Sequence, residues 1–573
     1  MIRKIIVILL LIFTLGGCQT KPVIQGGLVS TGSTPYVIST EDLGHLQGLL
    51  DALKAGQSIS LATPVVTFTP TFATTSTNTV TPVSTFTVTP TFTQTVTPTT
   101  VTSTPIPASN YYYVSLAGND QNSGTFDSPW RTFSKATKSV QPGNTVYIRG
   151  GTYTEQLSPT VNGTASNYIT FAGYPGEVTT LSVAGISVAG KNYIRLGNLN
   201  VTGSTTNCVS ITNSTYIEVN GLNVSNCNTR GIYVSGGNQI TISNNKVNHI
   251  TLSSGIAVWN STNILVDGNT ITNAHWYHEC QGAYDEALTI SVVDHFVVSN
   301  NTLDNTEANP TGFCNTYSDK LGIDVKESSQ NGLVFKNKIN HMTAAGLYVD
   351  GWLAGSSGTP TLNHIDLYQN TLNETGGILV GDEQSVGVVE YINIYNNLVL
   401  DSYFSGIQVT GAWGDGLRKN IKIYNNTVYG ADIVGGNGGA GIYVTTAHLA
   451  SNNTDKPIII KDNISMFYFL NVGSAGTVGQ IRAGNSTMSN LITADHNIVY
   501  AVQICSQSFP NCIEVGQRIS STPSSLFIDP TNFDLHLKVG SPAISNGDLF
   551  NNLIVDFDGL PKGLNIGAYS FHN

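Results

Sequence analysis

Two short strand patterns recur along the chain, and they constrain its fold more than any other feature. One is Gly-apolar-x-apolar, which occurs at Gly231-Ile-Tyr-Val, Gly255-Ile-Ala-Val, Gly322-Ile-Asp-Val, Gly346-Leu-Tyr-Val, Gly377-Ile-Leu-Val, Gly406-Ile-Gln-Val and Gly441-Ile-Tyr-Val. The other is an alternating strand that ends on Asn, as in Ile240-Thr-Ile-Ser-Asn-Asn245 and Ile421-Lys-Ile-Tyr-Asn-Asn426. A single repeat cannot bury its apolar side chains, whereas stacked repeats can. The sequence therefore predicts a solenoid of short strands.

The repeated Asn marks the place where the backbone must turn. Asn tolerates left-handed backbone conformations, and its side-chain amide can bond to the copies above and below it. Leucine-rich repeats would show a different Leu and Asn spacing with a helix in each repeat, and propeller blades would be longer. The pattern therefore favours an all-β parallel β-helix.

Segments on both sides of the repeat resemble a known group of proteins. They are Tyr111-Tyr-Tyr-Val-Ser, Ser128-Pro-Trp130 and Thr145-Val-Tyr-Ile-Arg-Gly-Gly-Thr-Tyr153 before it, and Gly540-Ser-Pro-Ala543 and Asn565-Ile-Gly-Ala-Tyr569 after it. These segments are similar to the opening and closing parts of right-handed parallel β-helix repeat proteins of the pectate-lyase-like superfamily. The resemblance implies that fold from residue 108 to 573. It implies no single activity, because the group includes lyases, hydrolases, epimerases and proteins of no known reaction.

The N-terminal part predicts export and lipid anchoring. Residues 1–18 have a basic start, a short apolar run and Leu15-Gly16-Gly17-Cys18, which resembles the lipobox of a bacterial lipoprotein signal peptide. We expect Cys18 to be lipidated and the rest of the chain to be extracellular, anchored to the bacterial cell membrane through the lipid only. An ordinary signal peptide with a chance cysteine is the alternative.

The composition then changes twice before the repeats begin. Residues 19–61 are a short N-terminal segment of mixed composition. Residues 62–107 are almost wholly Thr, Pro, Val, Phe, Ser and Ala, which cannot build a core and favour an extended chain, so this stretch is predicted to be a disordered linker. Residues 108–573 are predicted to form the β-helix domain with N- and C-terminal capping segments.

Charge and cysteine content narrow the partners and the covalent links. The formal net charge is −11 and no cluster of Lys and Arg appears, which excludes a nucleic-acid partner. We expect a monomer.

The seven cysteines are Cys18 and three couples that lie close in sequence: Cys208 with Cys227, Cys280 with Cys314, and Cys505 with Cys512. Disulfides are expected in an exported chain, and six cysteines allow about 15 connectivities, so pairing within couples rests on proximity alone. The first couple would staple neighbouring coils.

The outward face of the Gly-apolar-x-apolar strands is where chemistry is expected. Alternation turns the apolar side chains inward, so the x side chains should face solvent. Most of them are small, polar or aromatic, and charge is concentrated in two adjacent coils, at Asp324, Lys326 and Asp350. These three residues are therefore the first candidates for a catalytic site.

The spacing of the two aspartates suits glycoside hydrolysis. Coils stack about 4.8 Å apart and two residues of a strand span about 6.6 Å, so Asp324 and Asp350 lie on a diagonal of about 8 Å. That span lies in the inverting range, although side-chain movement leaves retention open. Lys326 stacks on Asp350 and favours its ionised form, which suits a base and leaves Asp324 as the acid. Glu286 on the preceding strand is a third candidate carboxylate. The alternative is that Lys326 and Asp350 form a surface ion pair without function.

Aromatic and ionisable side chains near this face are candidates for binding a sugar. Trp259, Tyr348 and Trp352 can stack on sugar rings, with His275 at the entrance. Packing under a turn is the alternative for the tryptophans, and a solvated insertion loop is the alternative for His275. Asp382-Glu383 is a weak calcium signal. No metal site is therefore predicted, and Ca²⁺ stays an open cofactor.

Three functions follow from these residues, in order of preference. The first is an extracellular glycoside hydrolase that cleaves a polysaccharide or oligosaccharide with paired carboxylates. The second is a pectate-type polysaccharide lyase, implied by the resemblance, with Lys326 as the base; no compact calcium-binding cluster of aspartates supports it. The third is a non-catalytic, stalked glycan-binding β-helix.

Overall fold

In the computed structural model, residues 102–573 form one compact unit. The structure describes the following ranges: 110–274, 285–306, 320–351, 361–381, 387–410, 417–431, 440–445, 458–466, 481–484, 492–500, 513–514, 518–548 and 555–571. Cys18 and the predicted linker lie outside them. Within these ranges, no helix has the length and apolarity that crossing a membrane requires.

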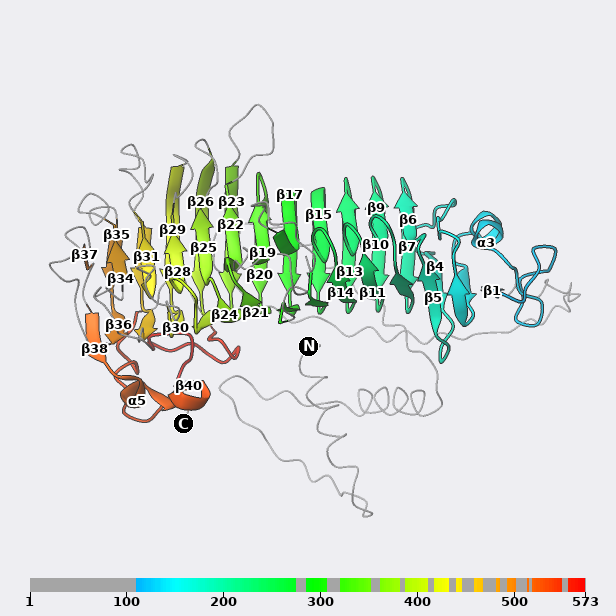
Figure 1. Ribbon diagram of the computed structural model, residues 1–573. Coiled ribbons are helices and arrows are strands. Elements are labelled where there is room, and N and C mark those ends of the chain that lie inside the picture. Colours follow the sequence, from blue (N-terminus) through cyan, green and yellow to red (C-terminus); the bar gives the residue numbers. More distant parts are fainter. Residues whose placement is uncertain are drawn as a thin grey trace, which may run out of the picture. The chain divides into compact units, whose positions relative to one another are not determined.

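Short parallel strands stack into a right-handed β-helix, which confirms the predicted fold (Figure 1). We name its three columns of strands A, B and C. Column A carries the Gly-apolar-x-apolar pattern. Its strands are β6 (Ile186–Ala189), β9 (Val209–Thr212), β12 (Ile232–Ser235), the first half of β15 (Ile256–Asp267), the first half of β17 (Asp285–Ser299), β19 (Lys320–Lys326), β22 (Ala345–Asp350), β25 (Ile378–Gly381), β28 (Ile407–Val409), β31 (Ile442–Val444) and β34 (Ile481–Ala483), with β37 (Ile513–Glu514) pairing antiparallel.

Column B carries the alternating strands that end on Asn. It contains β1 (Tyr111–Val114), β2 (Thr145–Ile148), β4 (Ile169–Gly173), β7 (Asn192–Gly197), β10 (Thr215–Asn220), β13 (Asn238–Ser243), the second halves of β15 and β17, β20 (Gln330–Phe335), β23 (Thr361–Tyr368), β26 (Val388–Tyr395), β29 (Leu417–Tyr424), β32 (Ile458–Lys461) and β35 (Ile492–Asp495).

Column C follows the Asn turn and completes each coil. Its strands are β3 (Gly151–Tyr153), β5 (Thr179–Ser182), β8 (Asn200–Thr202), β11 (Asn223–Cys227), β14 (Lys246–Ile250), β16 (Thr270–Thr272), β18 (Thr302–Asp304), β21 (Lys338–Met342), β24 (Thr371–Thr375), β27 (Leu398–Leu400), β30 (Thr427–Tyr429), β33 (Ile464–Met466), β36 (Asn497–Tyr500) and β38 (Arg518–Ser521).

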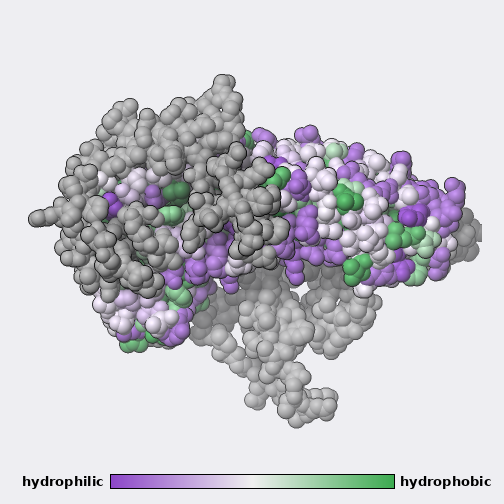
Figure 2. Space-filling view, in the orientation of Figure 1, coloured by the Kyte–Doolittle hydropathy of each residue, from purple (hydrophilic) through white to green (hydrophobic). Residues whose placement is uncertain are grey.

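The core lies inside the coils and consists of the alternating apolar positions. Ile232 and Val234 of β12 are fully buried, and they pair in register with Ile256 and Val258 of the next coil. Because each inward side chain meets its counterparts one coil above and below, the coils share one continuous hydrophobic core. In the view of Figure 2, apolar surface appears only as scattered spots among hydrophilic and neutral residues.

The predicted asparagine stack is present at the turn between columns B and C. Each side-chain amide nitrogen donates to the amide oxygen of the Asn in the next coil, at 2.9–3.0 Å, and every member is buried. The members are Asn245, Asn269, Asn301, Asn337, Asn370, Asn397, Asn426, Asn463 and Asn497. The residue before each turn Asn is left-handed, for example Asn244 at φ 54° and Asn425 at φ 54°. Both properties that favoured Asn in the sequence are therefore used.

The N-terminal capping segment contains a helix that the sequence did not predict. This helix, α3 (Phe133–Ser139), begins at Thr132, whose side chain accepts a hydrogen bond from the Lys135 amide. The Glu155 carboxylate accepts the Phe133 and Ser134 amides at 2.7 and 2.8 Å. Phe133 is buried against Tyr153 of the first coil, which fixes the helix on the β-helix.

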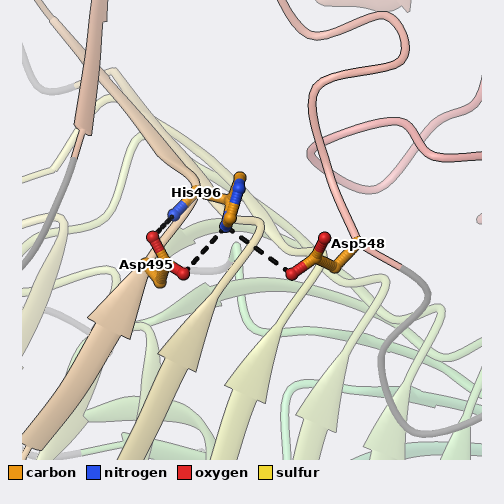
Figure 3. Close-up of side chains that lie close together, drawn as sticks. All are labelled: Asp495, His496 and Asp548. Carbon is orange, nitrogen blue, oxygen red and sulfur yellow. Dashed lines mark hydrogen bonds and ion pairs between the residues drawn. The ribbon is translucent and has the colours of Figure 1, made fainter.

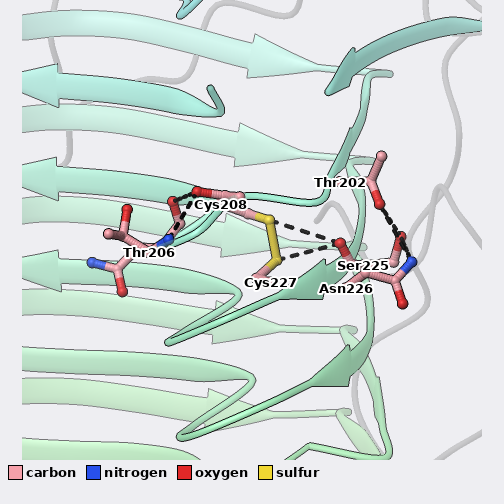
Figure 4. The surroundings of a disulfide bond; sticks show 8 residues. Thr202, Thr206, Cys208, Ser225, Asn226 and Cys227 are labelled. Carbon is pink, nitrogen blue, oxygen red and sulfur yellow. Dashed lines mark hydrogen bonds between the residues drawn. A yellow bond between two sulfur atoms is a disulfide. The ribbon is translucent and has the colours of Figure 1, made fainter. Parts of the chain in front are cut away.

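One predicted disulfide lies within the described residues. Cys208 and Cys227 are bonded (Figure 4). Cys208 stands at the start of one coil and Cys227 at the end of the same coil. The predicted pairing is therefore confirmed, but the bond joins the two ends of one coil and does not staple neighbouring coils as expected. The Cys208 amide contacts the following coil, where it donates to the Arg230 carbonyl. The other two cysteine couples lie outside the described residues.

The C-terminal segment lies along column C (Figure 1). Its elements are α5 (Pro523–Leu526), β39 (Phe527–Asp529), η1 (Pro530–Asn532) and β40 (Asp534–Leu537). The outward positions of column C are polar in β24, at Thr371 and Asn373, and apolar in the next strand, at Leu398 and Leu400. These leucines pack into a second hydrophobic cluster with side chains of the C-terminal segment, such as Phe527. The change of polarity along column C therefore marks where the segment docks.

Candidate active site

The charged candidates lie together on the outer side of column A, on three adjacent strands. Parallel pairing aligns Thr289 of β17, Asp324 of β19 and Tyr348 of β22 in one row. It aligns Ser291, Lys326 and Asp350 in the next row. Lys326 therefore lies opposite Asp350, as predicted.

Lys326 joins carboxyl groups from two coils. Its ammonium forms a hydrogen-bonded ion pair with Glu286 Oε1 and lies 3.2 Å from Asp324 Oδ2. Because each such contact spans about 3 Å, the two carboxyl groups lie within about 6 Å of each other. The third carboxylate of the sequence prediction is thus a central member of the cluster.

The prediction that these side chains face solvent is wrong. Asp324 is 1% exposed, Asp350 2% and Glu286 8%. Alternation correctly gives the direction in which each side chain leaves its strand, but it carries no information about what covers that side of the coil. The chemistry at this site is therefore that of partly desolvated charges, whose mutual interactions are stronger than at a surface.

The electrostatics favour the ionised form of Glu286. Burial disfavours the Glu286 carboxylate, but the Lys326 ammonium outweighs burial and lowers the pKa of Glu286. A hydrogen bond with Asp324 lowers the pKa of Glu286 further.

Lys326 is held in its charged form. Burial works to lower its pKa, but Asp324, Glu286 and Asp350 together raise the pKa above the ordinary value for lysine. A lysine that acts as a general base needs a lowered pKa. In this arrangement Lys326 neutralises and orients the carboxyl groups.

Two hydroxyl groups that the sequence interpretation did not select complete the surroundings of Glu286. Thr289 Oγ1 donates to Glu286 Oε2 at 3.2 Å, and Ser254 Oγ lies 2.7 Å from Thr289 Oγ1. Both residues are buried. Ser and Thr are common at outward positions of this chain, so only proximity to Asp324 in the register distinguishes Thr289 in the sequence.

The predicted sugar-binding residues have different surroundings. Trp259 of β15 lies in register with Ser291 of the next coil, and the Arg230 guanidinium lies 4.9 Å from its ring. Tyr348 is 5% exposed and packs with Leu321 and Ala345, so the expectation of an open ring is wrong for it. His275 and Trp352 lie outside the described residues.

Two groups of acidic side chains bear on metal binding. Asp382-Glu383 lies outside the described residues. Within the described ranges, one group has ligand atoms close enough for a cation, Asp495, His496 and Asp548, all within 4.8 Å of one another (Figure 3). The Lys461 ammonium lies 2.5 Å from Asp548 Oδ2 and already supplies positive charge there. We assign no metal to this group.

Comparison with known proteins relates the first coils to a described family. Residues 112–281 match the family "Pel9A-like, right handed beta helix region". These residues are similar to that family over its right-handed β-helix region. The match ends before Glu286, so it covers the N-terminal coils of this β-helix and leaves the carboxyl cluster outside.

Individual relatives match shorter stretches. "Uncharacterized protein YwoF" of Bacillus subtilis is 43% identical over 86 residues, 15% of this chain and 18% of that protein. "Pectate lyase PEL9" of Emericella nidulans is 40% identical over 67 residues, 11% of this chain and 16% of that protein. The matched stretches thus span less than a fifth of either relative. The solved structure "The complex structure of XylC with xylose" has a TM-score of 0.47 and 9% identity, covering 80% of this chain and 98% of that one.

Proposed function

We propose that this chain is a carbohydrate-active enzyme, and specifically a glycoside hydrolase that cleaves a polysaccharide or oligosaccharide. One observation carries the proposal: the carboxyl groups of Asp324 and Glu286 are buried side by side and are joined by the Lys326 ammonium. Glycoside hydrolysis requires one protonated and one ionised carboxyl group flanking the scissile bond. Most other outward positions in column A offer no such pair.

The lowered pKa of Glu286 suits the ionised role and leaves Asp324 as the proposed acid. Asp324 protonates the glycosidic oxygen of the leaving group, and Glu286 is the ionised partner that attacks the anomeric carbon. Carboxyl groups about 5–5.5 Å apart give retention, whereas about 6.5–9.5 Å leaves room for a water and gives inversion. The Lys326-bridged pair is closer than the inverting range and leaves no room for a water between the carboxyl groups, so retention is the proposed outcome. Asp350, on the longer diagonal from Asp324, is the predicted base of the inverting alternative.

A digestion of a glycan panel tests the proposal. New reducing ends from at least one glycan are expected, without products that absorb in the ultraviolet. Proton NMR of the first products should show the anomeric configuration of the substrate. Inverted products would transfer the partner role to Asp350, and binding without cleavage of any glycan would favour a non-catalytic glycan-binding β-helix.

A polysaccharide lyase is the second candidate, supported by the Pel9A-like helix and by the stretch shared with pectate lyase PEL9. It would use Lys326 as the base that removes a proton from a uronate. The raised pKa of Lys326 argues against that role. Unsaturated products that absorb in the ultraviolet would decide for the lyase.

We also propose that the enzyme acts outside the cell as a lipid-anchored protein. The lipobox-like segment ending at Cys18 and the Thr/Pro-rich composition of residues 62–107 support this location. A macromolecular glycan is a substrate that such an enzyme would meet there.

A further inference from the structure

Glu286 is held through both of its carboxylate oxygens. Oε1 contacts the Lys326 ammonium, and Oε2 accepts a hydrogen bond from Thr289. Thr289 in turn contacts Ser254, at the edge of the preceding coil. Thr289 is 1% exposed and Ser254 2%, so water does not compete for these contacts.

The direction of this hydrogen-bond chain follows from the proton count. The Thr289 hydroxyl has one proton, and an ionised Glu286 can only accept it. Thr289 Oγ1 must then accept from Ser254. The chain therefore runs from the Ser254 hydroxyl through the Thr289 hydroxyl to Glu286 Oε2, and every donor in it favours negative charge on Glu286.

We propose that Ser254 and Thr289 are positioning residues that fix the Glu286 carboxylate and favour its ionised form. The proposal rests on the proposed hydrolase and adds how the two adjacent carboxyl groups receive different roles. Lys326 alone does not decide this, because its ammonium contacts both carboxyl groups. The hydroxyl chain adds a second contact to Glu286, through Oε2, that does not depend on Lys326.

The β-helix itself does not require a hydroxyl at position 289. In the preceding coil the corresponding outward position is Ala257, and in the coil before that it is Tyr233. Two residues further along β17, Ser291 makes a comparable buried contact, donating to Glu327 Oε2 at 2.9 Å. Glu327 is not part of the carboxyl cluster, which makes Ser291 a matched control within the same strand.

The charged groups that face Glu286 set the expected pH behaviour. Within the described residues these are Lys326 and Asp324 of β19, with Asp350 of β22 next to Lys326. All three are retained in the variants below. Loss of the Thr289 hydroxyl removes a donor to the carboxylate and should raise the pKa of Glu286 by on the order of one unit.

The test compares Thr289→Val, Thr289→Ser, Ser254→Ala and Ser291→Ala. The acidic limb of kcat/KM against pH should move upward by on the order of one pH unit in Thr289→Val. It should move less in Ser254→Ala and return in Thr289→Ser, while Ser291→Ala keeps the wild-type profile. Equal profiles for Thr289→Val and Ser291→Ala would overturn the proposal.

A second readout separates this proposal from the proposed function. Carbon-detected NMR of protein labelled at the Glu side-chain carboxyl carbon follows Glu286 titration without a substrate, with Glu286→Gln identifying its signal. An upward shift in Thr289→Val supports the positioning role even if no glycan is cleaved. An unchanged Glu286 titration in a folded Thr289→Val protein contradicts it even if the wild type is an active hydrolase.

Discussion

Lys326 Nζ lies 3.2 Å from Asp324 Oδ2, although both side chains belong to the same strand, and it reaches Glu286 on the preceding strand as well. In a strand, residues two apart share a face, and neighbouring coils are about 4.8 Å apart. One long side chain can therefore contact a residue of its own strand and a residue of the neighbouring coil. The lysine thus couples two coils through buried charge. Removal of its charge should affect folding before it affects chemistry.

The first prediction is that Lys326→Ala destabilises the fold strongly. Breaking a buried ion pair by removing one partner leaves uncompensated carboxyl groups and typically costs about 3–5 kcal/mol. The free energy of unfolding in urea should fall by about that amount, whereas Lys326→Arg should lose less. Lys419→Ala removes a more exposed ion pair with Glu390, 2.6 Å long, and should cost no more than about 1 kcal/mol. Equal losses for the two Ala variants would contradict a buried cluster.

The second prediction ranks the three carboxyl groups in catalysis. Asp324→Asn and Glu286→Gln should each reduce kcat by about 10²–10⁴-fold, because a positioned acid or nucleophile is lost. Asp350→Asn should be milder, because Asp350 acts through Lys326 in the retaining mechanism. Circular dichroism of each variant at the pH of the assay provides the folding control. If Asp350→Asn were the most severe variant and the products inverted, the original Asp324 and Asp350 assignment would hold.

The sequence predicts the β-helix well because the repeated residues are the ones that form the core and the turns. Ile232 and Val234 fill the interior, and Asn245 bonds to its copy in the next coil. The register of Lys326 on Asp350 also follows from alternation. All of these depend on local spacing and stacking, which a repeat preserves.

The parts that sequence reasoning missed depend on contacts outside the repeat. The burial of Asp324 could not be predicted, because alternation does not say what covers a face. The sequence does indicate where the C-terminal segment docks, because Leu398 and Leu400 are apolar at positions where the preceding coil is polar, but this change of polarity did not enter the prediction. Thr289 had no signal of its own, because a hydroxyl is common on this face.

The third prediction concerns the asparagine stack. Asn370→Ala removes the donors to Val334 O and Asn397 Oδ1 and the acceptor for Asn337, all within the buried turn. Each buried group left without a partner costs about 1–3 kcal/mol, so a loss of several kcal/mol is expected in urea unfolding. Asn373→Ala, on the outer side of β24 in the same coil, should change stability by less than about 0.5 kcal/mol. A small effect at both positions would show that the asparagine stack contributes little to the free energy of unfolding.

The fourth prediction tests the lipid anchor. Cys18→Ser should abolish lipid attachment and leave the protein in the aqueous phase after detergent partitioning, because the lipidated residue of a lipobox is the cysteine. Metabolic labelling with a fatty-acid analogue should give signal only in the wild type. Replacement of Cys208 by Ser serves as the control, since that cysteine is in a disulfide. Unchanged partitioning of Cys18→Ser would mean that another feature holds the protein at the membrane.

The last prediction concerns pH and Asp462, which contacts the C-terminal segment. Its side chain is fully buried, and its backbone carbonyl accepts the Gly567 amide. The pKa of Asp462 is raised from 3.8 to about 6, mainly by burial; the Asp548 carboxylate adds to the increase, and the Asp548 amide and Lys461 oppose it. Because the folded pKa is the higher one, the folded state binds more protons than the unfolded state between these values.

Stability should therefore fall as pH rises through this window and stay low above pH 6, as far as Asp462 is concerned. Asp462→Asn keeps the shape without the charge, and its left-handed backbone at φ 57° suits Asn, as at Asn396 and Asn425. The urea midpoint of Asp462→Asn should exceed that of the wild type at pH 7 and match it near pH 4. Lys562, whose pKa burial lowers to about 7, acts in the window above pH 7, where stability rises with pH. A difference between variant and wild type that is the same from pH 4 to 7 would show that the charge of Asp462 does not titrate in the fold.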